Sequence, residues 1–437
     1  MASSVQPPWG KQSSGVTHMS NRSEPQVLVA GAGPVGLFAA LCLARRGVKP
    51  WIIDEAWRGA THSYALALHP TSLELLEELG LAKNALDGAR RLSRVALYEG
   101  KERRGELDLS KLPTRFPFIA VLPQAELEEL LVSALQAQGV EVEWNRRLAL
   151  IKHEAAGVEV TVETLTKEAQ GYVVAHEETV VESSETLTVP FLLGADGHES
   201  LTRTQLRVGF DEVRPAEQFA VFEVQGEDDG TDEMRIGLEQ GSTNVLWPMP
   251  GNRHRWSFQV GDDVHVWQDS RDKDRLLGIG HGPSFLETAN LPKLVAERAP
   301  WFGEETGVTR WRTAVRFDYG LARSFGKGRA WLAGEAGHAT GPVGMQSMNV
   351  GFREAWRLAE IFAGVLQGTL KVEALAAYDQ ERRAEWTRLL GIGDDRLAPT
   401  ERTPDWIRRH ADRLSPCIPG GGAAFEQLVG QLGFQTR

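Results

Sequence analysis

The segment from Val27 to Asp54 constrains the fold more than any other part of the sequence. Four apolar residues, VLVA, lead into the glycine-rich turn GAGPVG, an apolar stretch with helical spacing, LFAALCLARRG, and a strand-like segment, KPWIID. Strand, glycine-rich turn, helix and a second strand ending in an acid are the parts of a βαβ unit that binds a dinucleotide. We therefore predict an α/β protein with a Rossmann-like domain.

The residues of this unit each have a physical reason. Gly31 permits the tight turn, Gly33 lets the backbone approach a pyrophosphate, and Gly36 lets the helix pack against the strand. Asp54 follows the turn by about 20 residues, where a carboxylate can accept hydrogen bonds from the ribose hydroxyls of an adenosine. The unit predicts a bound dinucleotide but does not specify which one.

Two further glycine-rich turns follow strand-like segments. Residues 329–352 read RAWLAGEAGHATGPVGMQSMNVGF, which predicts a strand ending near Glu335, a loop and a helix. The N–H groups at the start of such a helix favour an anion or a carbonyl-rich ring. Upstream, FLLGADGHESLTRTQL predicts a buried strand that ends in the turn GADG.

The order of the three motifs, GAGPVG, GADG and GEAGHATGP with its following MN helix, resembles that of the FAD-dependent aromatic hydroxylases. These are single-component flavoprotein monooxygenases related to para-hydroxybenzoate hydroxylase, and the resemblance runs from about Val27 to about Trp386. It implies a Rossmann-like FAD-binding domain, an interleaved antiparallel-sheet substrate domain and a helical C-terminal part. The predicted limits are a disordered tail at 1–25, the FAD-binding domain at 26–206 and 323–386, the substrate sheet at 207–322 and the C-terminal segment at 387–437.

The resemblance also implies roles for single residues on the nucleotide side of FAD. Gly31, Gly33 and Gly36 would hold the pyrophosphate, and Asp54 would hold the adenosine ribose. Gln124, in VLPQAELEELL, would contact the flavin or its ribityl chain. In the GADG turn, Asp196 with Gly197 would contact FAD and the nicotinamide nucleotide.

On the flavin side, the resemblance places five residues beside the ring and the ribityl chain. Glu335 takes the place of an aspartate that binds the ribityl hydroxyls. Pro342 would lie at the reactive edge of the flavin, followed by Gly344 in the same loop. The backbone N–H groups at Met348 and Asn349, where the helix is expected to open, would meet N1 and the C2 carbonyl of the ring.

The activity implied by the resemblance is a monooxygenase reaction that uses NADPH or NADH and O2. A C4a-hydroperoxyflavin would hydroxylate or epoxidise a hydrophobic aromatic or quinone-like small molecule, in specialised metabolism. No acid or base is assigned, and His338 is expected to support the structure. A reductase or saturase of the same fold and a non-catalytic FAD-binding protein remain alternatives. A flavin-dependent halogenase would need a W-x-W-x-I-P run, which this sequence does not contain.

The stretch between residues 207 and 322 alternates apolar and polar residues in FAVFEVQG, EMRIGLEQ, NVLWPMPG and HRWSFQVGD. This pattern predicts an antiparallel sheet, which the resemblance makes the substrate roof. Trp247, Arg316 and Pro342 are candidate substrate contacts. A tryptophan in this stretch more often belongs to the core than to a pocket wall, and Arg316 can equally form a surface ion pair.

Three positions depart from the pattern of the resembling family. Tyr64 stands where relatives commonly carry an arginine that helps bind the nicotinamide nucleotide. Met345 and Ser347 stand where glycines are usual, so the pocket beside the ring is expected to be bulkier. Glu335 is one methylene longer than the usual aspartate.

Composition excludes several classes of protein. The chain has 437 residues, of which 42% are hydrophobic and 24% charged, and its net charge of -11 does not favour nucleic acid. No apolar run approaches the roughly 20 residues of a membrane span. The two cysteines, Cys42 and Cys417, are expected to be buried thiols, which fits the cytoplasm. We predict a monomer or homodimer with no metal site.

Overall fold

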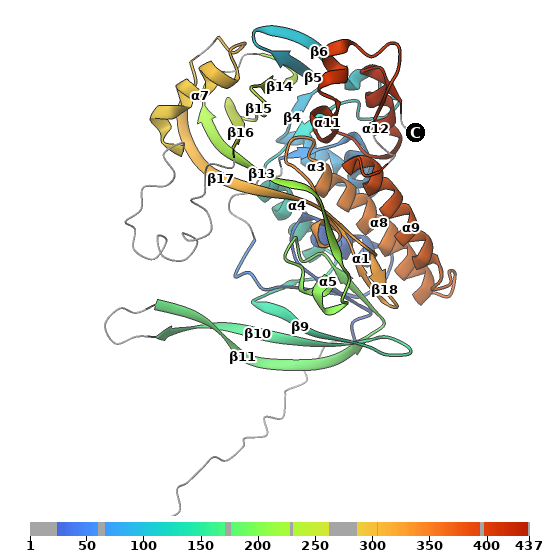
Figure 1. Cartoon of the computed structure of the whole chain (residues 1–437). Helices are drawn as coiled ribbons and strands as arrows, with labels where there is room; N and C mark the ends of the chain where they lie inside the picture. Colours follow the sequence, from blue (N-terminus) through green and yellow to red (C-terminus); the bar gives the residue numbers. More distant parts are fainter. Residues whose placement is uncertain are drawn as a thin grey trace, which may run out of the picture.

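The computed structural model describes residues 24–59, 66–170, 176–227, 230–261, 286–303, 305–393 and 397–435. Tyr64 and all but the last two residues of the predicted tail lie outside the described residues. The fold is a mixed α/β fold, as predicted, and it contains two large sheets joined by long strands (Figure 1).

The βαβ unit forms the centre of a six-stranded sheet with the order β18-β19-β12-β1-β2-β8. β1 pairs in parallel with both β12 and β2, and only the short β18 runs antiparallel to its neighbour. The strands are β1 (Val27–Ala30), β2 (Pro50–Asp54), β8 (Val142–Trp144), β12 (Phe191–Gly194), β18 (Gly326–Lys327) and β19 (Ala330–Leu332). All three predicted glycine-rich turns therefore follow neighbouring strands of this sheet.

Both faces of the six-stranded sheet are covered, which explains why its central strands β1, β12 and β19 are buried at every position. Val27 and Val29 of β1 pack on the helical side, while Leu28 and Ala30 pack on the other. The helical side consists of α1 (Pro34–Arg45), α4 (Gln124–Gln136), α8 (Gln346–Leu366) and α9 (Ala374–Leu390). Cys42 lies buried in α1, as predicted.

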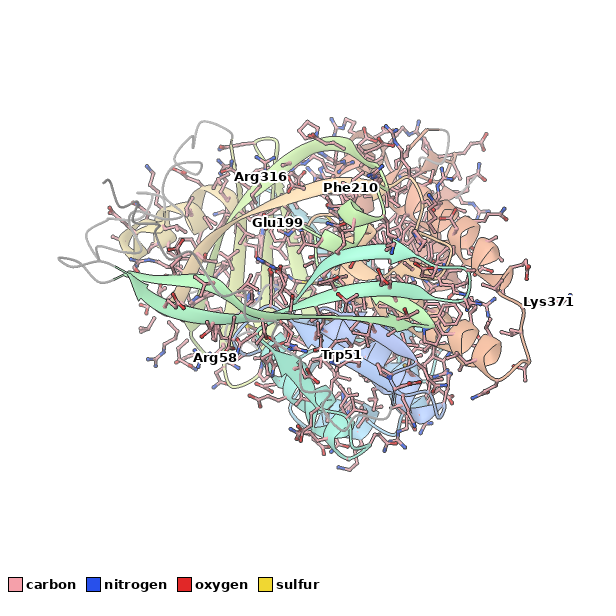
Figure 2. All side chains as sticks on the ribbon, turned by 90° about the horizontal axis from the view of Figure 1, so that it is seen from below. Trp51, Arg58, Glu199, Phe210, Arg316 and Lys371 are labelled. Atoms are coloured by element: carbon pink, nitrogen blue, oxygen red, sulfur yellow. The ribbon has the colours of Figure 1, made fainter. Side chains whose placement is uncertain are left out.

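A three-stranded antiparallel sheet covers the other face, and no pattern in the sequence led us to expect it. It consists of β9 (Arg146–His153), β10 (Val158–Gln170) and β11 (His176–Val189). In Figure 2 these strands cross the front of the molecule, and Trp51 of β2 packs in the same hydrophobic cluster as their apolar side chains. The long β10–β11 pair extends beyond the body of the protein (Figure 1).

The second large sheet has eight strands in the order β20-β17-β13-β16-β15-β14-β5-β6. The four strands predicted from alternation between residues 207 and 322 are confirmed as β13 to β16. The strands are β5 (Arg94–Glu99), β6 (Glu102–Asp108), β13 (Phe210–Gln225), β14 (Glu233–Glu239), β15 (Ser242–Met249), β16 (Arg253–Val260), β17 (Val308–Ala322) and β20 (His338–Ala339). α7 (Leu291–Arg298) packs on the face that carries Trp256.

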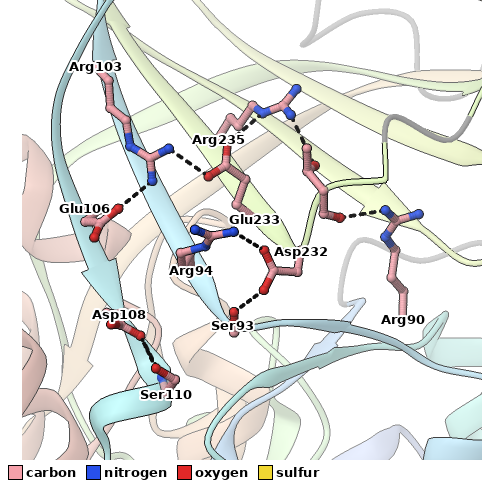
Figure 3. A network of polar contacts seen from close by, with 11 residues as sticks. Arg90, Ser93, Arg94, Arg103, Glu106, Asp108, Ser110, Asp232, Glu233 and Arg235 are labelled. Atoms are coloured by element: carbon pink, nitrogen blue, oxygen red, sulfur yellow. Dashed lines mark hydrogen bonds and ion pairs between the residues drawn. The ribbon is translucent and has the colours of Figure 1, made fainter.

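The eight-stranded sheet is mixed, because β14 pairs in parallel with β5. β5 and β6 lie inside the range 26–206 that the sequence assigned to the FAD-binding domain, yet they extend the eight-stranded sheet. A charged network supports this junction (Figure 3): the Glu233 carboxylate accepts hydrogen bonds from Arg103 at 3.0 Å and from Arg235 at 3.1 Å. Arg94 pairs with Asp232 beside it.

Small elements connect the two sheets. β3 (Ala67–Leu68), β7 (Ile119–Val121) and β4 (Arg90–Leu92) form a short antiparallel sheet. The connecting helices are α2 (Pro70–Glu78), α3 (Ala82–Asp87) and α5 (Leu201–Gln205), and a 3-10 turn, η5 (Gly334–Ala336), follows β19.

The C-terminal segment is largely helical, as predicted, and it packs against the β6 edge of the eight-stranded sheet. Its elements are α10 (Asp405–Arg409), α11 (Ala411–Leu414), η6 (Ser415–Cys417), α12 (Gly422–Gln431) and the short pair β21 (Ala398–Pro399) and β22 (Phe434–Gln435). The backbone N–H of Asp108 in β6 donates to Gln431 of α12 at 2.7 Å. Cys417 is a buried free thiol, as predicted. None of the helices in the described ranges is long and apolar enough to cross a membrane.

Candidate cofactor and substrate site

The first glycine-rich turn is packed tightly on one side and open on the other. Gly31 has a φ of +101°, and a Cβ there would lie 2.3 Å from the carbonyl oxygen of Ala195. A Cβ on Gly36 would lie 1.9 Å from the carbonyl oxygen of Gly31. Gly33 differs, because no protein atom lies within 4 Å of a Cβ built on it. The turn therefore exposes its backbone at Gly33, at the start of α1.

Asp54 holds the shape of this turn. Its Oδ2 accepts a hydrogen bond from the N–H of Ala32 at 2.6 Å, and its Oδ1 accepts one from Ala56 at 2.8 Å. A carboxylate has about four acceptor positions, so two hydrogen bonds do not exhaust it. A contact between Asp54 and a ribose stays a prediction. The structure shows that Asp54 also holds the shape of the turn.

The second motif is tied to the third. The Asp196 carboxylate accepts hydrogen bonds from Ser200 Oγ at 2.6 Å and from the N–H of Thr202 at 2.8 Å, so it caps α5. Arg203 of α5 then donates to the carbonyl oxygen of Ala336, in the third motif, at 2.8 Å. The Asp196 side chain is thus engaged within the protein, and it is the neighbouring Gly197 that reaches the cavity described below.

A buried carboxylate on α8 supports the third motif. Glu354 accepts hydrogen bonds from the N–H of Gly334 at 2.8 Å and from Trp386 Nε1 at 2.7 Å, and it pairs with His338 Nε2 at 3.1 Å. His338 also stacks on Trp386, with ring centroids 3.7 Å apart. Burial would raise the pKa of Glu354, but attraction to His338 and Arg382 and these hydrogen bonds outweigh it and hold that pKa below its ordinary value.

The helix after the third motif begins earlier than expected, at Gln346 instead of Met348. The residue before it, Met345, has a φ of 51° and turns the chain into the helix. Since the first N–H groups of a helix have no partner within it, the groups that can face a ligand are those of Gln346, Ser347 and Met348. The expectation that Asn349 also opens the helix is therefore wrong.

Asn349 instead fixes the helix to the neighbouring chain. Its Oδ1 accepts hydrogen bonds from the N–H of His69 and from Ser72 Oγ, both at 2.7 Å. Its Nδ2 donates to the carbonyl oxygens of Ala67 at 2.9 Å and Met345 at 2.7 Å. These four bonds use the full capacity of the amide, so the side chain positions the loop and does not contact a ligand.

The three motifs enclose one cavity of about 430 Å³. Predicted site residues on its wall are Gly33, Gln124, Gly197, Arg316, Glu335, Pro342 and Met348, and the departing residues Met345 and Ser347 lie there too. Sequence reasoning missed Val315, Phe317 and Asp318 of β17, which also line it. Apolar and polar residues alternate along β17, but the sequence does not show which face of this strand lies toward the loop.

Two polar side-chain atoms at this cavity are buried without a partner. They are the hydroxyl oxygen of Ser347 and Oε1 of Gln346, whose Nε2 donates to the carbonyl oxygen of Ile418 at 3.1 Å. The exposed Glu335 carboxylate, also on the cavity wall, makes no hydrogen bond or ion pair with any described residue. Buried polar atoms without partners are rare, so this wall fits a polar ligand.

The remaining predicted residues lie away from the large cavity. Gly31 and Gly36 pack inside the turn, and Gly344 packs against the C-terminal segment, where a Cβ would lie 2.5 Å from the carbonyl oxygen of Pro416. Trp247 lies on β15 of the eight-stranded sheet. It lines a second, smaller cavity whose wall consists of Leu66, Val221, Val245, Trp247, Arg255, Ser257, Phe317, Pro342, Val343 and Met345.

The two cavities share Phe317, Pro342 and Met345, so they meet at the loop after the third motif. Arg316, labelled in Figure 2, forms an exposed ion pair with Asp318 at 3.0 Å, and both residues line the large cavity. Arg316 is therefore an ion-paired surface residue, which is one of its two predicted roles. A contact between Arg316 and the substrate stays a prediction.

His69 links α2 to the same loop. Its Nε2 lies 2.9 Å from the carbonyl oxygen of Gly344. Burial, together with repulsion from Arg353, lowers the pKa of His69 from 6.5 to about 4 despite this hydrogen bond. The folded protein therefore holds a neutral imidazole, whereas the unfolded chain binds a proton below about pH 6.5.

Because of His69, the free energy of unfolding is expected to decrease as the pH is lowered. The contribution is complete above about pH 6.5 and is lost as pH falls toward the folded pKa of about 4. Between about pH 7 and about pH 5 the loss is about 2 kcal/mol. Denaturant unfolding of the protein and of His69→Gln at the two pH values measures it. The wild-type protein should lose about 2 kcal/mol more than the variant, and equal losses would contradict the account.

The parallel sheet, the open glycine turn and the shared cavity define a dinucleotide-binding flavoprotein fold. The family model of the FAD binding domain matches residues 24–391. The chain belongs to this family of FAD-binding domains.

Relatives within this family are monooxygenases by name. The chain is 31% identical to 6-methylpretetramide 4-monooxygenase of Streptomyces rimosus over 93% of this chain and 66% of the relative. It is 27% identical to pentachlorophenol 4-monooxygenase of Sphingobium chlorophenolicum over 84% and 63%. The chain thus spans slightly less than two thirds of these relatives. A crystal structure of aklavinone-11 hydroxylase with FAD and aklavinone shares the fold, with a TM-score of 0.69 at 20% identity, covering 94% of this chain and 73% of that one.

Proposed function

We propose that the protein is an FAD-dependent monooxygenase that uses NADPH or NADH and O2 to hydroxylate or epoxidise a hydrophobic aromatic or quinone-like small molecule. The observation that carries this proposal is the meeting of a motif-lined cavity and a sheet-lined cavity at Pro342. When bound, FAD accepts a hydride from the nicotinamide and activates oxygen for transfer to carbon. The residues of the protein bind and orient FAD and the substrate, and they exclude water from the site.

The residues of the large cavity fit FAD. The open backbone at Gly33 would receive the pyrophosphate, and the unpaired Glu335 carboxylate would accept the ribityl hydroxyls. Gln124, on the first turn of α4, would contact the ribityl chain of FAD. The N–H groups that begin α8 favour negative charge and carbonyl oxygens at the ring. Ser347 Oγ, buried without a partner, would gain one there.

The smaller cavity, of about 10 Å³, is an apolar extension of the space beside Pro342 in which the substrate would lie. Its wall is mostly apolar and its tryptophan, Trp247, is 1% exposed, so the site can exclude water from the reacting centre. Pro342, on both cavities, would stand between the flavin edge and the substrate. Two relatives are named for 6-methylpretetramide and pentachlorophenol, which supports an aromatic substrate. A role in specialised metabolism belongs to the same proposal.

The domain division follows from this placement. We infer that residues 26–206, apart from β5 and β6, hold FAD together with residues 323–386. Residues 207–322 with β5 and β6 form the substrate roof, and residues 387–437 pack against its edge. A cytoplasmic location and a monomeric or homodimeric state belong to the same proposal.

Oxidation of NADH or NADPH by the FAD-loaded protein, followed together with oxygen uptake and hydrogen peroxide, tests the proposal. A monooxygenase should consume oxygen with the nicotinamide, and an aromatic substrate should lower the share of peroxide. A reductase or saturase would oxidise the nicotinamide with an accepting substrate in the absence of oxygen. A non-catalytic FAD-binding protein would do neither, and either result would overturn the proposal.

Replacement of Glu335 with alanine is expected to weaken FAD binding about tenfold to hundredfold, because hydrogen bonds to a charged group contribute about 1.5–3 kcal/mol. Fluorescence titration of the apoprotein with FAD measures the change. Glu129→Ala, on the exposed side of α4, is the matched control and should bind FAD normally. Glu335→Asp tests the extra methylene: tighter binding would show that Glu335 is a compromise, and equal binding that the length is tolerated. Unchanged affinity in Glu335→Ala would remove Glu335 from the site.

A further inference from the structure

One buried apolar residue in the loop after the third motif has a strained backbone. Met345 has a φ of 51°, in the left-handed region that residues other than glycine and asparagine rarely adopt. Met345 is 8% exposed. Among the described residues, the other non-glycine residues with a positive φ are all polar or charged, namely Asn145, Arg207, Gln240 and Asn252. A left-handed methionine inside the protein needs a reason, because glycine would form the same turn without strain.

The backbone at Met345 is fixed by its neighbours. Its carbonyl oxygen accepts a hydrogen bond from Asn349 Nδ2 at 2.7 Å, and its N–H donates to the carbonyl oxygen of Pro342 at 3.3 Å. The next residue, Gln346, donates through Nε2 to the carbonyl oxygen of Ile418 in the C-terminal segment at 3.1 Å. Backbone strain persists only where the surrounding structure fixes it in this way. The fold therefore sets the direction in which the Met345 side chain leaves the loop.

Met345 lies where the two cavities meet. It lines both the large and the smaller cavity, together with Phe317 and Pro342. The large cavity has about 430 Å³, whereas the smaller one has about 10 Å³, which is room for about one water molecule. The smaller cavity is also lined by Val245 and Trp247 of β15, which are buried. It is therefore an apolar recess that is too small for an aromatic ring.

The shape of a methionine suits it to close such a recess. Its unbranched thioether chain has three rotatable bonds and fills irregular apolar gaps. Truncation of one large apolar side chain can open a cavity of about 150 Å³, which is enough to bind benzene. The Met345 side chain thus stands in the place of about one aromatic ring, between Pro342 and the recess.

We propose that Met345 is a specificity-determining residue that limits how far a planar aromatic substrate extends from Pro342 toward Trp247. Its side chain closes the entrance of the recess, so the protein accepts substrates that end beside Pro342 and rejects those with a further fused ring on that side. This inference rests on the proposed function, which places the substrate beside Pro342.

A series of phenols of increasing length tests the role of Met345. Phenol, 2-naphthol and 2-anthracenol carry the same hydroxyl group on one, two and three fused rings. Their binding to the FAD-loaded protein, without nicotinamide, is followed by the absorption spectrum of the flavin. In Met345→Gly we expect 2-anthracenol to bind about tenfold to hundredfold more tightly than in the wild type, because a further ring buries about four more carbon atoms. Phenol, which does not reach the recess, should bind with nearly unchanged affinity.

Two further variants separate substrate size from packing. Met345→Leu is the conservative variant, which keeps the volume of the side chain and should retain the wild-type order of affinities. Met249→Ala removes a buried methionine of β15 that lines neither cavity, and it should also retain that order. Glycine suits the φ of 51°, so Met345→Gly relieves strain, and a gain in affinity cannot arise from a loss of folding.

The two proposals fail in different ways. Equal affinity of 2-anthracenol for the wild type and Met345→Gly, or an equal gain for all three phenols, would overturn the role of Met345. A flavin spectrum that none of the phenols changes in either protein would overturn it as well. Each of these results leaves the monooxygenase proposal intact, because oxygen uptake with a nicotinamide decides that proposal.

Discussion

Replacing Gly33 with alanine is expected to weaken FAD binding about tenfold to hundredfold while leaving the apoprotein as stable as the wild type or slightly more stable. Gly33 has a φ of -71° and no protein atom within 4 Å of a built Cβ, so alanine fits the protein alone. A methyl group at that position occupies the space that a pyrophosphate needs, and such overpacking costs about 1–3 kcal/mol. Titration with FAD and denaturant unfolding of the apoprotein measure the two effects.

Gly36→Ala provides the opposite result at the same turn. Its Cβ would meet the Gly31 carbonyl oxygen at 1.9 Å, so the apoprotein itself should lose about 1–3 kcal/mol or more. Gly430→Ala in α12, where a Cβ meets no atom within 4 Å, controls for the substitution and should bind FAD normally. Normal FAD affinity in Gly33→Ala would show that the pyrophosphate lies elsewhere.

Replacing Glu354 with glutamine is expected to destabilise the protein by about 3 kcal/mol and to weaken FAD binding. The carboxylate accepts from Gly334 and Trp386 and pairs with His338, whereas an amide nitrogen in its place would face donors. Because Gly334 precedes Glu335, the change reaches the predicted ribityl contact. Thermal unfolding with and without FAD separates the two losses.

Glu360→Gln on the exposed face of the same helix is the matched control and should change stability by less than about 0.5 kcal/mol. A Glu354→Gln protein that retains wild-type stability would show that the buried network does not hold the loop. A protein that loses stability but binds FAD normally would limit Glu354 to a structural role.

Much of the fold could be predicted because its signals are local. The strand, turn and helix from Val27 to Asp54 appear as β1, α1 and β2, and the alternating strands appear in the eight-stranded sheet. The pairing of β5 with β14 could not be predicted, since more than one hundred residues separate the two strands and neither sequence indicates its partner. The β9–β11 layer was missed because charged residues on its solvent face mask the apolar positions that pack on β1.

The site was predictable to the extent that backbone geometry defines it. Glycine-rich turns after parallel strands meet at one edge of a sheet, so Gly33, Gly197 and Glu335 could be brought together from the sequence. The contacts of polar side chains were harder to predict from the sequence. Asp196 and Asn349 look like ligand contacts in a motif, but whether a side chain faces a ligand or the protein depends on tertiary partners such as Thr202 and His69.

The wall of the smaller cavity could not be predicted from the sequence, because it depends on the register of the strands. Trp247 and Arg255 become neighbours only through the pairing of β15 with β16, and a slip by one residue would turn either side chain to the opposite face.

The most direct test of the proposed function is the source of the oxygen atom in a product. The FAD-loaded protein is supplied with NADPH or NADH, ¹⁸O2 and a panel that includes 2-naphthoate and hydroxylated polycyclic aromatics, and products are analysed by mass spectrometry. We predict one labelled oxygen atom in a hydroxylated or epoxidised product, with nicotinamide oxidised in proportion. A product that is reduced, or oxygenated only from water, would contradict the account.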